Sequence, residues 1–364
     1  MEKIPSSYLQ LSTDDVSSRI REARLKLGPR AVVLVHHFQR DDVARQADFL
    51  GSSTELLARV ASLREADYLV LCGNRPLAEM MDILRDSRQK LLLVDEGGVC
   101  SMVASQVPKD YDGIVGELKR AGTSPVVPVV TDHAAIGVTA RAGEAGGALC
   151  TPGNAGAVLR WALGRGRVLF TPDRNLGYNA ARRSDVLADE IVDWKPGQPL
   201  GGNAPALLRK ARVILWGQTC AAHSQFKPEH VRKLRQRDPG IRILVHPSSP
   251  PEVVALADEV GASAHITRTV ENAAPGSRWG VGAHRNLVNR LAARFKDRQV
   301  LPLVNQGCLC SVMIRNEAAR LLWVLDNLVA GREVNRVTLH PDVLSGAMNA
   351  VIRMMEIQAF ESEA

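Results

Sequence analysis

The chain of 364 residues has few aromatic side chains, no long apolar run and no CxxC pair of cysteines. Aromatic residues make up only 4% of the sequence, so a surface on which nucleic-acid bases stack is not expected. No segment approaches the roughly 20 apolar residues that a membrane-spanning helix requires. The N-terminal sequence MEKIP lacks the apolar core of a secretory signal. We therefore expect a cytoplasmic location, with neither nucleic acid nor membrane as a partner.

Several local signatures of cofactor binding are also missing. The six cysteines include no CxxC pair, which argues against a zinc ribbon and against thioredoxin-type chemistry. Their wide spacing does not fit a small disulfide-stapled domain. The glycine-rich stretch at 143–147 is not followed by Gly-Lys-Ser, so it is not a P-loop, and no dinucleotide fingerprint is present. Any metal site must therefore use cysteines that meet only in the folded chain.

The sequence does contain the material for more than one globular domain. Hydrophobic residues make up 45% and charged residues 23% of a chain that is too long for one ordinary domain. The formal net charge is +7, and the basic residues are scattered along predicted helices. A solvated basic face is the simplest interpretation of this charge. Attraction of a small anionic carboxylate substrate is the next.

Short β-branched runs alternate with amphipathic helical stretches along the chain. This alternation predicts an α/β fold in which parallel sheets are covered by helices on both faces. The predicted strands are Ala31–Val35, Tyr68–Leu71, Leu91–Val94, Val126–Val130, Ala148–Cys150, Val168–Phe170, Val213–Trp216, Ile243–Val245, Ala264–Thr267 and Val300–Val304. The predicted helices include Asp41–Phe49, Leu77–Leu84, Ala155–Leu163, Pro228–Gln236 and Glu252–Val260.

An internal repeat is visible in the loops at the ends of the predicted strands. Three strands lead into a polar or histidine-bearing loop, at His36, His133 and His246. Three others lead through a short loop to a cysteine, namely Cys100, Cys220 and the pair Cys308 and Cys310. The repeat predicts three similar α/β domains, at 22–103, 104–221 and 222–340, with a C-terminal helix at 341–360 that packs on the first. Coincidence among ordinary βα units is the alternative explanation.

The cysteines at the strand ends suggest a shared cofactor. Ligands of parallel sheets bind beyond the carboxyl ends of the strands. In a pseudo-threefold arrangement of the domains, the three cysteines would face one cavity and suit a [4Fe–4S] cluster with one open iron, because full ligation needs four cysteines. From the cysteines alone, buried inert thiols are the simpler interpretation, and Cys72 and Cys150 fit it. Cys308 and Cys310 cannot be told apart as ligands at this point.

Five motifs together give the chain a family resemblance. They are VHHFQ at Val35–Gln39, ADFLGSS at Ala47–Ser53, PDRNLG at Pro172–Gly177, WGQTCAAH at Trp216–His223 and VHP at Val245–Pro247. In this order and spacing, from about residue 30 to 330, they resemble quinolinate synthase. Each motif is weak by itself, and the specificity lies in the combination.

The resemblance implies three α/β domains around a central active site, with one cysteine of each domain bound to a [4Fe–4S] cluster. The matching residues are Cys100, Cys220 and Cys310, which favours Cys310 over Cys308. Quinolinate synthases condense iminoaspartate with dihydroxyacetone phosphate, with dehydrations at the open iron, to form a precursor of NAD. By the same resemblance, positions that contact substrate or handle protons match His36, Ser53 and His246.

The chain departs from the family pattern at positions that carry acids and bases. The family has a tyrosine at Phe38, a Tyr-x-Asn motif at Val129 and Thr131, and a glutamate at Ser248. It also has Ser-Thr where this chain has Ala262-Ser263, Gly-Thr-Glu where it has Gly282-Ala283-His284, and a serine-bearing turn where it has Thr151–Asn154, of which Asn154 is retained. Because a general base typically contributes about 10² to 10⁴ in rate, these losses predict a poor parent reaction.

The candidate site residues come from the internal repeat, from the family resemblance and from the positions at which the chain differs from the family pattern. The candidate catalytic residues are His36 and His246, together with His133 and His284 as replacement acids or bases, for which an ordinary loop histidine is the alternative. The candidate substrate contacts are Ser53, Thr131, Asn154, Ser248 and Ser263. The candidate cluster ligands are Cys100, Cys220 and Cys310.

We predict a quinolinate synthase-like [4Fe–4S] enzyme, a lyase or transferase that is a monomer or homodimer. Its open iron would act as a Lewis acid in dehydration or condensation of a small carboxylate or imino acid. The substrate need not be iminoaspartate plus dihydroxyacetone phosphate. The alternatives are a divergent true quinolinate synthase, cluster-based sulfur transfer in a specialised biosynthetic pathway, and a non-catalytic cluster sensor.

Overall fold

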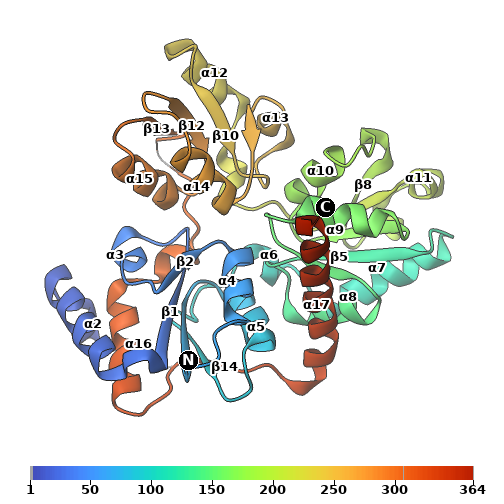
Figure 1. Cartoon of the computed structure of the whole chain (residues 1–364). Helices are drawn as coiled ribbons and strands as arrows, with labels where there is room; N and C mark the ends of the chain where they lie inside the picture. The colour runs from blue at the N-terminus through green and yellow to red at the C-terminus, as the bar shows by residue number, and fades with distance from the viewer. Residues whose placement is uncertain (1–2, 306, 364) are drawn as a thin grey trace. The chain divides into compact units, whose positions relative to one another are not determined.

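The computed structural model describes residues 3–305 and 307–363, and their strands form three separate sheets. The chain divides into two compact units. The first consists of residues 3–99, His284–Lys296 and Leu309–Leu339, and the second of Cys100–Ala283, Asp297–Cys308 and 340–363. One sheet lies in the first unit and two lie in the second (Figure 1). All strand pairs are parallel except that of the short β14 (Arg336–Val337), which confirms the predicted fold class.

The sheet of the first unit has the strand order β14-β4-β3-β1-β2. Helices α2 and α16 lie side by side on one of its faces and share a core with β1, β3 and β4 (Figure 1). The strands of this unit are β1 (Ala31–His36), β2 (Phe49–Gly51), β3 (Tyr68–Cys72), β4 (Lys90–Leu93) and β14. Its helices are α1 (Ser6–Leu9), α2 (Thr13–Leu27), α3 (Asp41–Ala44), α4 (Ser53–Val60), α5 (Arg75–Leu84), α15 (Arg285–Arg294) and α16 (Ala318–Val329).

The larger sheet of the second unit has the order β6-β5-β7-β9-β8. Its strands are β5 (Val126–Thr131), β6 (Ala148–Cys150), β7 (Arg167–Thr171), β8 (Ile191–Trp194) and β9 (Val213–Trp216). The associated helices are α6 (Ser101–Ala104), α7 (Pro108–Arg120), α8 (Ile136–Glu144), α9 (Ala155–Leu163), α10 (Arg174–Arg182), α11 (Pro205–Lys210) and α17 (Pro341–Glu363).

The smaller sheet of the second unit has the order β11-β10-β12-β13. Its strands are β10 (Arg242–Val245), β11 (Glu259–Val260), β12 (Arg278–Gly282) and β13 (Gln299–Pro302). Its helices within this unit are α12 (Pro228–Arg237), α13 (Pro251–Val254) and α14 (Ser263–Glu271). Among the described residues no helix has the length and apolar character needed to cross a bilayer.

The three sheets share one topology. In each, the first strand is central, the second strand flanks it on one side, and the third strand and then the cysteine-bearing strand lie on the other. The strands that precede the predicted ligands are β4, β9 and β13. The repeat that the strand endings suggested is therefore present in the sheets themselves, which brings equivalent loops to the carboxyl edge of each sheet.

Some predicted elements are wrong in kind or in length. The predicted strand at Ala264–Thr267 lies inside α14, whose buried residues Ser263, Ile266 and Val270 follow a helical spacing. Short apolar runs fit both periods, and only their packing decides between them. The predicted helices Asp41–Phe49 and Glu252–Val260 each divide into a short helix and a short strand, namely α3 with β2 and α13 with β11.

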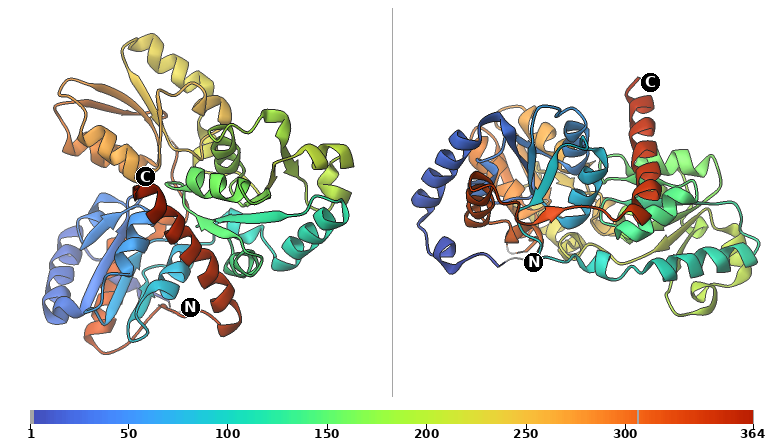
Figure 2. Two further views of the ribbon diagram at one scale, coloured as in Figure 1. Left: turned by 45° about the vertical axis from the view of Figure 1, so that its right-hand side comes forward. Right: turned by 90° about the horizontal axis from the view of Figure 1, so that it is seen from below.

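The last two helices overturn parts of the predicted domain organisation. Helix α16 shares the core of the first unit, so Leu309–Leu339 belongs with the first sheet and not with a third domain ending at 340. Helix α17 packs on α8, α9 and β6 of the second unit, not on the first domain (Figure 2). Both helices are apolar on one side, and an apolar side alone does not specify the surface that it covers.

The contact between α17 and α8 depends on two glycines. A Cβ atom added at Gly143 would overlap the carbonyl oxygen of Gly346, and one added at Gly346 would overlap the backbone of Ala140. We expect Gly143→Ala to lower the free energy of unfolding by about 2 kcal/mol, because the helices must separate. Urea unfolding measures this loss. Gly113→Ala on α7, where an added Cβ meets nothing, is the control, and equal effects of the two variants would contradict the close helix contact.

Candidate functional site

The first strand of each sheet ends in a turn of the same design. The Phe38 N–H donates to Nδ1 of His36, the His133 N–H donates to Oγ1 of Thr131, and the Ser248 N–H donates to Nδ1 of His246, each over 3.2 Å. A side chain at the strand end thus fixes the backbone two residues later. Three of the predicted site residues therefore have a structural role in shaping their loops, whatever else they do.

The third strand of each sheet is followed by a capped helix. Asn74, Asp173 and His284 accept hydrogen bonds from backbone N–H groups in the first turns of α5, α10 and α15, over 2.9, 3.1 and 3.3 Å. Such caps satisfy N–H groups that have no partner within the helix. Two of these caps, Asp173 and His284, are buried and ionisable, so they are also candidates for chemistry.

The six thiols fall into two groups by exposure. Cys100, Cys220 and Cys310 are partly exposed, and Cys72, Cys150 and Cys308 are buried. Burial raises the pKa of the Cys72 and Cys150 thiols, and nearby Asp132 and Asp173 raise that of Cys150 further. A metal ligand must be a thiolate, so these two residues suit packing, as the sequence indicated. The backbone N–H of Cys308 donates to Oε1 of Gln225 over 3.0 Å.

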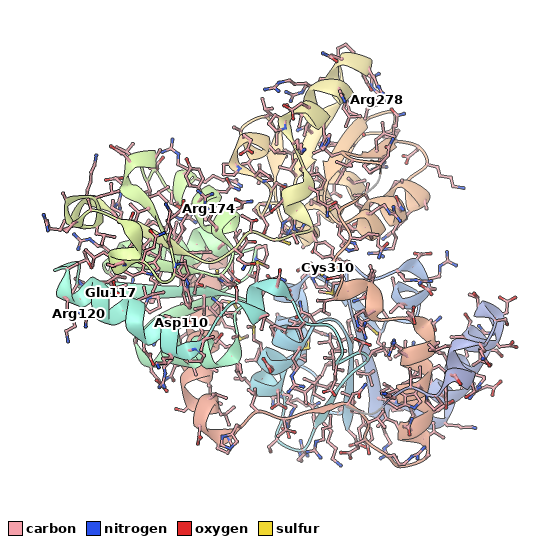
Figure 3. The ribbon with its side chains drawn as sticks, turned by 180° about the vertical axis from the view of Figure 1, so that it is seen from behind. Asp110, Glu117, Arg120, Arg174, Arg278 and Cys310 are labelled. Atoms are coloured by element: carbon pink, nitrogen blue, oxygen red, sulfur yellow. The ribbon has the colours of Figure 1, made fainter. Side chains whose placement is uncertain are left out.

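In the first unit, His284 joins the loop of His36 to Cys310. The Phe38 ring stacks on the His284 ring at 5.0 Å and meets the His36 ring edge-on at 4.7 Å. The Cys310 N–H donates to Nε2 of His284 over 2.9 Å. His284 is fully buried, and burial lowers its pKa to about 3, so the ring is neutral. A neutral imidazole accepts at one nitrogen only, so it can accept from just one of the two backbone N–H groups that face it, that of Asn286 at Nδ1 or that of Cys310 at Nε2. These contacts place the His284 ring against the backbone of Cys310, which Figure 3 labels.

Arg290 on α15 holds the loop that carries His36. Its guanidinium donates to the backbone carbonyl oxygens of His37 and, over 3.0 Å, of Gln39. The amide of Asn286 donates to the carbonyl of Phe38 over 3.1 Å. Burial lowers the pKa of Arg290 and also lowers that of His37, to about 4. Three successive carbonyl groups of this loop are thus fixed by one helix.

Asp95 joins the segment before Cys100 to the segment after Cys310. Its side chain is 3% exposed and accepts from Arg315 over 2.7 Å and from Arg320 over 3.1 Å. Arg315 belongs to the short 3-10 helix Met313–Arg315 that follows Cys310. A carboxylate so deeply buried is stable because two guanidinium groups pair with it.

In the second unit, two histidines stack beside Cys220. Nδ1 of His223 lies 3.2 Å from Sγ of Cys220, and its ring stacks on that of His246 at 4.0 Å. Both histidines are buried, at 4% and 3% exposure. His223 is therefore in direct contact with a predicted ligand.

The loop of His246 is anchored to α10. Asn179 donates to the carbonyl oxygens of Pro247 and Ser249 over 2.8 and 2.9 Å. The Ser248 hydroxyl hydrogen-bonds to Asp173, and burial raises the pKa of that carboxyl group. Ser248 thus contacts a carboxyl group at the place where the family pattern has a glutamate.

The loop after β5 carries a carboxylate beside an imidazole. Oδ1 of Asp132 lies 2.8 Å from Nδ1 of His133. The Asp132 side chain is 1% exposed and that of His133 is 28% exposed. Burial by itself would lower the pKa of His133, but Asp132 and Asp173 outweigh it and raise the pKa. Thr131, a predicted substrate contact that precedes this pair in the chain, is fully buried.

The remaining predicted substrate contacts lie at the starts of helices. Ser53 and Ser263 are the first residues of α4 and α14, and both are buried. The cap of α4 is Ser52 and not Ser53, because Ser52 forms a capping box with Glu55. Asn154 accepts from the N–H of Thr151 over 2.7 Å.

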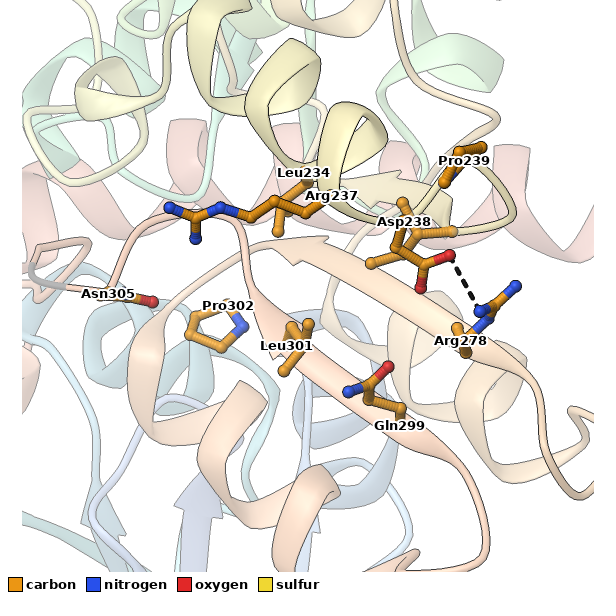
Figure 4. A pocket seen from close by; sticks show the side chains of 10 residues that line it. Leu234, Arg237, Asp238, Pro239, Arg278, Gln299, Leu301, Pro302 and Asn305 are labelled. Atoms are coloured by element: carbon orange, nitrogen blue, oxygen red, sulfur yellow. Dashed lines mark ion pairs between the residues drawn. The ribbon is translucent and has the colours of Figure 1, made fainter.

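The cavity in Figure 4 runs beside the edge strand β13. It has a volume of about 530 Å³ and is bounded by the end of α12, the segment before β10 and the edge strand β13. Two of its lining residues, Arg278 and Asp238, form an ion pair at 3.0 Å. Arg278 begins β12, and Pro302 ends β13 with Asn305 just beyond it, so the lining residues come from both ends of these strands.

Comparison with known proteins identifies the family. A family model described as Quinolinate synthetase A protein matches residues 18–356. A quinolinate synthase of Acidobacterium capsulatum is 39% identical over 359 residues, covering 96% of this chain and 95% of that protein. Those of Herpetosiphon aurantiacus and Corynebacterium glutamicum are 38% and 37% identical, covering 96% and 97% of this chain and 94% and 90% of theirs. The chain belongs to the quinolinate synthase family.

The resemblance found in the sequence is thereby confirmed, and so is its assignment to a family of biosynthetic enzymes. Sequence reasoning missed Asp95, Asp132, Asp173 and Arg290. Asp132 adjoins the candidate His133, and Asp173 lies within a motif that carries the resemblance, so the sequence offered a reason to consider both residues. Nothing in the sequence pointed to Asp95 or Arg290, because the residues that they contact are distant in the chain. Arg174, beside Asp173, pairs with Asp193 at 2.8 Å (Figure 3).

Among the described residues, no group of three or more histidine, cysteine, aspartate or glutamate side chains is arranged for one metal ion. A cluster makes a different demand, because each cysteine ligand binds a different iron. The cluster ligands, the catalytic histidines and the substrate contacts therefore remain predictions.

Proposed function

We propose that this member of the quinolinate synthase family is an enzyme that holds a [4Fe–4S] cluster on Cys100, Cys220 and Cys310. The cluster would supply an open iron as a Lewis acid for dehydration or condensation of a small carboxylate or imino acid. The observation that carries the proposal is the repeat: in each sheet the equivalent strand leads to a partly exposed cysteine.

The residues around two of these cysteines fit a cluster. His223 contacts Sγ of Cys220, and the backbone N–H of Cys310 is held by His284. Polar partners of this kind orient ligands and tune a cluster. The buried thiols of Cys72 and Cys150 are less suitable as cluster ligands, because their raised pKa values disfavour the thiolate.

We propose further that the substrate differs from iminoaspartate plus dihydroxyacetone phosphate. Phe38 has no phenolic hydroxyl and is packed between two imidazoles, so that position offers no proton. Ser248 cannot act as the carboxylate that the family pattern has there. The carboxyl groups of the second unit are instead at Asp132 and Asp173. The acid–base groups are therefore present in a different arrangement.

Anaerobic reconstitution with ferrous iron and sulfide tests the cluster. We expect about four iron atoms and four sulfides per chain. We expect Cys100→Ser, Cys220→Ser and Cys310→Ser each to lose most of both and of the visible absorbance. Cys308→Ser and Cys150→Ser are the matched controls and should retain the cluster. Loss in Cys308→Ser with retention in Cys310→Ser would overturn the ligand assignment.

The same holoprotein tests the substrate. With iminoaspartate and dihydroxyacetone phosphate, we expect quinolinate formation at least about 10²-fold below that of the Acidobacterium capsulatum relative, since a general base is missing. Equal rates would contradict the altered substrate and identify a true quinolinate synthase, while leaving the cluster assignment intact.

A further inference from the structure

The Asp132–His133 pair differs from the other histidines of the candidate site. His36 and His246 use Nδ1 to accept a backbone N–H, and His284 uses both ring nitrogens in contacts with backbone N–H groups. These three rings are at most 5% exposed. Nδ1 of His133 faces a carboxylate, and its side chain is 28% exposed. Of these four histidines, His133 is the best placed to exchange a proton with a bound molecule.

The geometry of the pair fixes the tautomer of the imidazole. A carboxylate can only accept a hydrogen bond. Nδ1 of His133 therefore carries the proton and donates to Oδ1 of Asp132 over 2.8 Å. Nε2 is then the basic nitrogen, and within residues 3–305 and 307–363 the structure gives it no partner. Carboxylate–imidazole pairs of this kind orient a general base and stabilise its protonated form.

The surroundings of the pair also suit proton transfer. Asp173 at the start of α10 interacts electrostatically with His133, and its own carboxyl group hydrogen-bonds to Ser248. Cys150 at the end of β6 adjoins both carboxyl groups but is a neutral thiol. The Thr131 hydroxyl fixes the backbone N–H of His133, and the Ala135 N–H just beyond donates to Gln106 over 3.0 Å. The loop is thus held from several sides.

We propose that Asp132 and His133 form the proton-transfer pair of this enzyme, with His133 as the catalytic residue and Asp132 as the positioning residue. The proposal rests on the proposed function. Nε2 of His133 removes a proton from the carbon next to a carboxylate of a β-hydroxy acid. The C–H electrons first pass into the carboxylate as an enediolate, which can recapture a proton from solvent, and then form a carbon–carbon double bond as the neighbouring C–O bond breaks. The hydroxide takes a proton, from His133 or solvent, and leaves as water.

The first test follows His133 without substrate. In protein labelled with ¹⁵N in its histidines, NMR titration should show His133 with a pKa above the ordinary 6.5. In Asp132→Asn the pKa should fall. The pair His340 and Asp342 lies 3.2 Å apart and is highly exposed, so Asp342→Asn is the matched control and should leave the titration of His133 unchanged. An unaltered His133 pKa in Asp132→Asn would overturn the pairing.

The second test uses L-malate, a small β-hydroxy acid, as the probe. Anaerobic holoprotein is incubated with it in D₂O, and ¹H NMR follows exchange of the hydrogens at C3. We expect exchange to rise with pH through the His133 pKa, since the neutral imidazole is the base. His133→Asn should lower the rate at least about 10²-fold and Asp132→Asn about tenfold, while His340→Asn should have no effect.

The outcomes separate this proposal from the proposed function, because iron and sulfide are measured on the same samples. Added imidazole should restore part of the exchange in His133→Gly, which a merely structural residue would not permit. Absence of exchange in wild-type holoprotein, or full exchange in His133→Asn with a complete cluster, would overturn the pair. Loss of the cluster in the wild type would instead contradict the proposed function.

Discussion

Lowering the pH from 7 to 4 is expected to reduce the free energy of unfolding by several kcal/mol, because two buried histidines are neutral in the folded first unit. Burial lowers the pKa of His37 to about 4, and in the unfolded chain it returns to about 6.5. Between these values the unfolded chain binds more protons, so stability falls as the pH falls. His37 alone accounts for about 3 kcal/mol, and His284 acts in the same direction.

Urea unfolding at a series of pH values measures this loss. The variant His37→Gln should show a shallower dependence on pH than the wild type between pH 6.5 and 4, because it lacks the titrating ring. His340→Gln is the matched control, since His340 is exposed and its removal should leave the slope unchanged. Carboxyl groups titrate in both the wild type and His37→Gln. The difference between the two pH dependences therefore reports on His37 alone. Equal slopes for His37→Gln and wild type would contradict its burial as a neutral base.

Replacing Arg290 with methionine is expected to cost about 3 kcal/mol of stability and to loosen the loop of His36. The substitution leaves the buried carbonyl groups of His37 and Gln39 without their donor, and each such group costs about 1 to 3 kcal/mol. Urea unfolding measures the loss of stability.

Hydrogen exchange locates the effect of that substitution. The amide of Gln39, which donates to the His36 carbonyl, should exchange faster in Arg290→Met, whereas the central amides of β1 should keep their protection. Arg294→Met is the matched control on the same helix, because Arg294 is exposed and lies over the Phe295 ring. If both variants had the same effect, the two carbonyl contacts would not be what holds the loop.

The sequence was sufficient where the determining pattern is local. Continuous apolar runs predicted nearly all the central strands, since a strand buried on both faces must be apolar throughout. The loop residues after those strands revealed the repeat, and five motifs in order revealed the family. Ala264–Thr267 was wrong because a short apolar run fits a strand and a buried helix equally well.

The sequence was insufficient where a role depends on a partner distant in the chain. Ser248 was a candidate substrate contact, and only the folded second unit brings its hydroxyl to Asp173. His284 was a candidate base, and only the folded chain brings its ring to the backbone N–H of Cys310. Nothing local to Arg290 indicated that it would bind the carbonyl groups of a loop some 250 residues earlier.

By itself, the sequence determined the α/β class, the threefold repeat and the family. Tertiary structure alone decided that α16 completes the first unit, that α17 covers α8, and which thiols stay partly exposed. The reason is physical. Periodicity and turn chemistry act over a few residues and can be read along the chain. The choice of partner surface, and the burial that sets each pKa, depend on contacts between segments that meet only after folding.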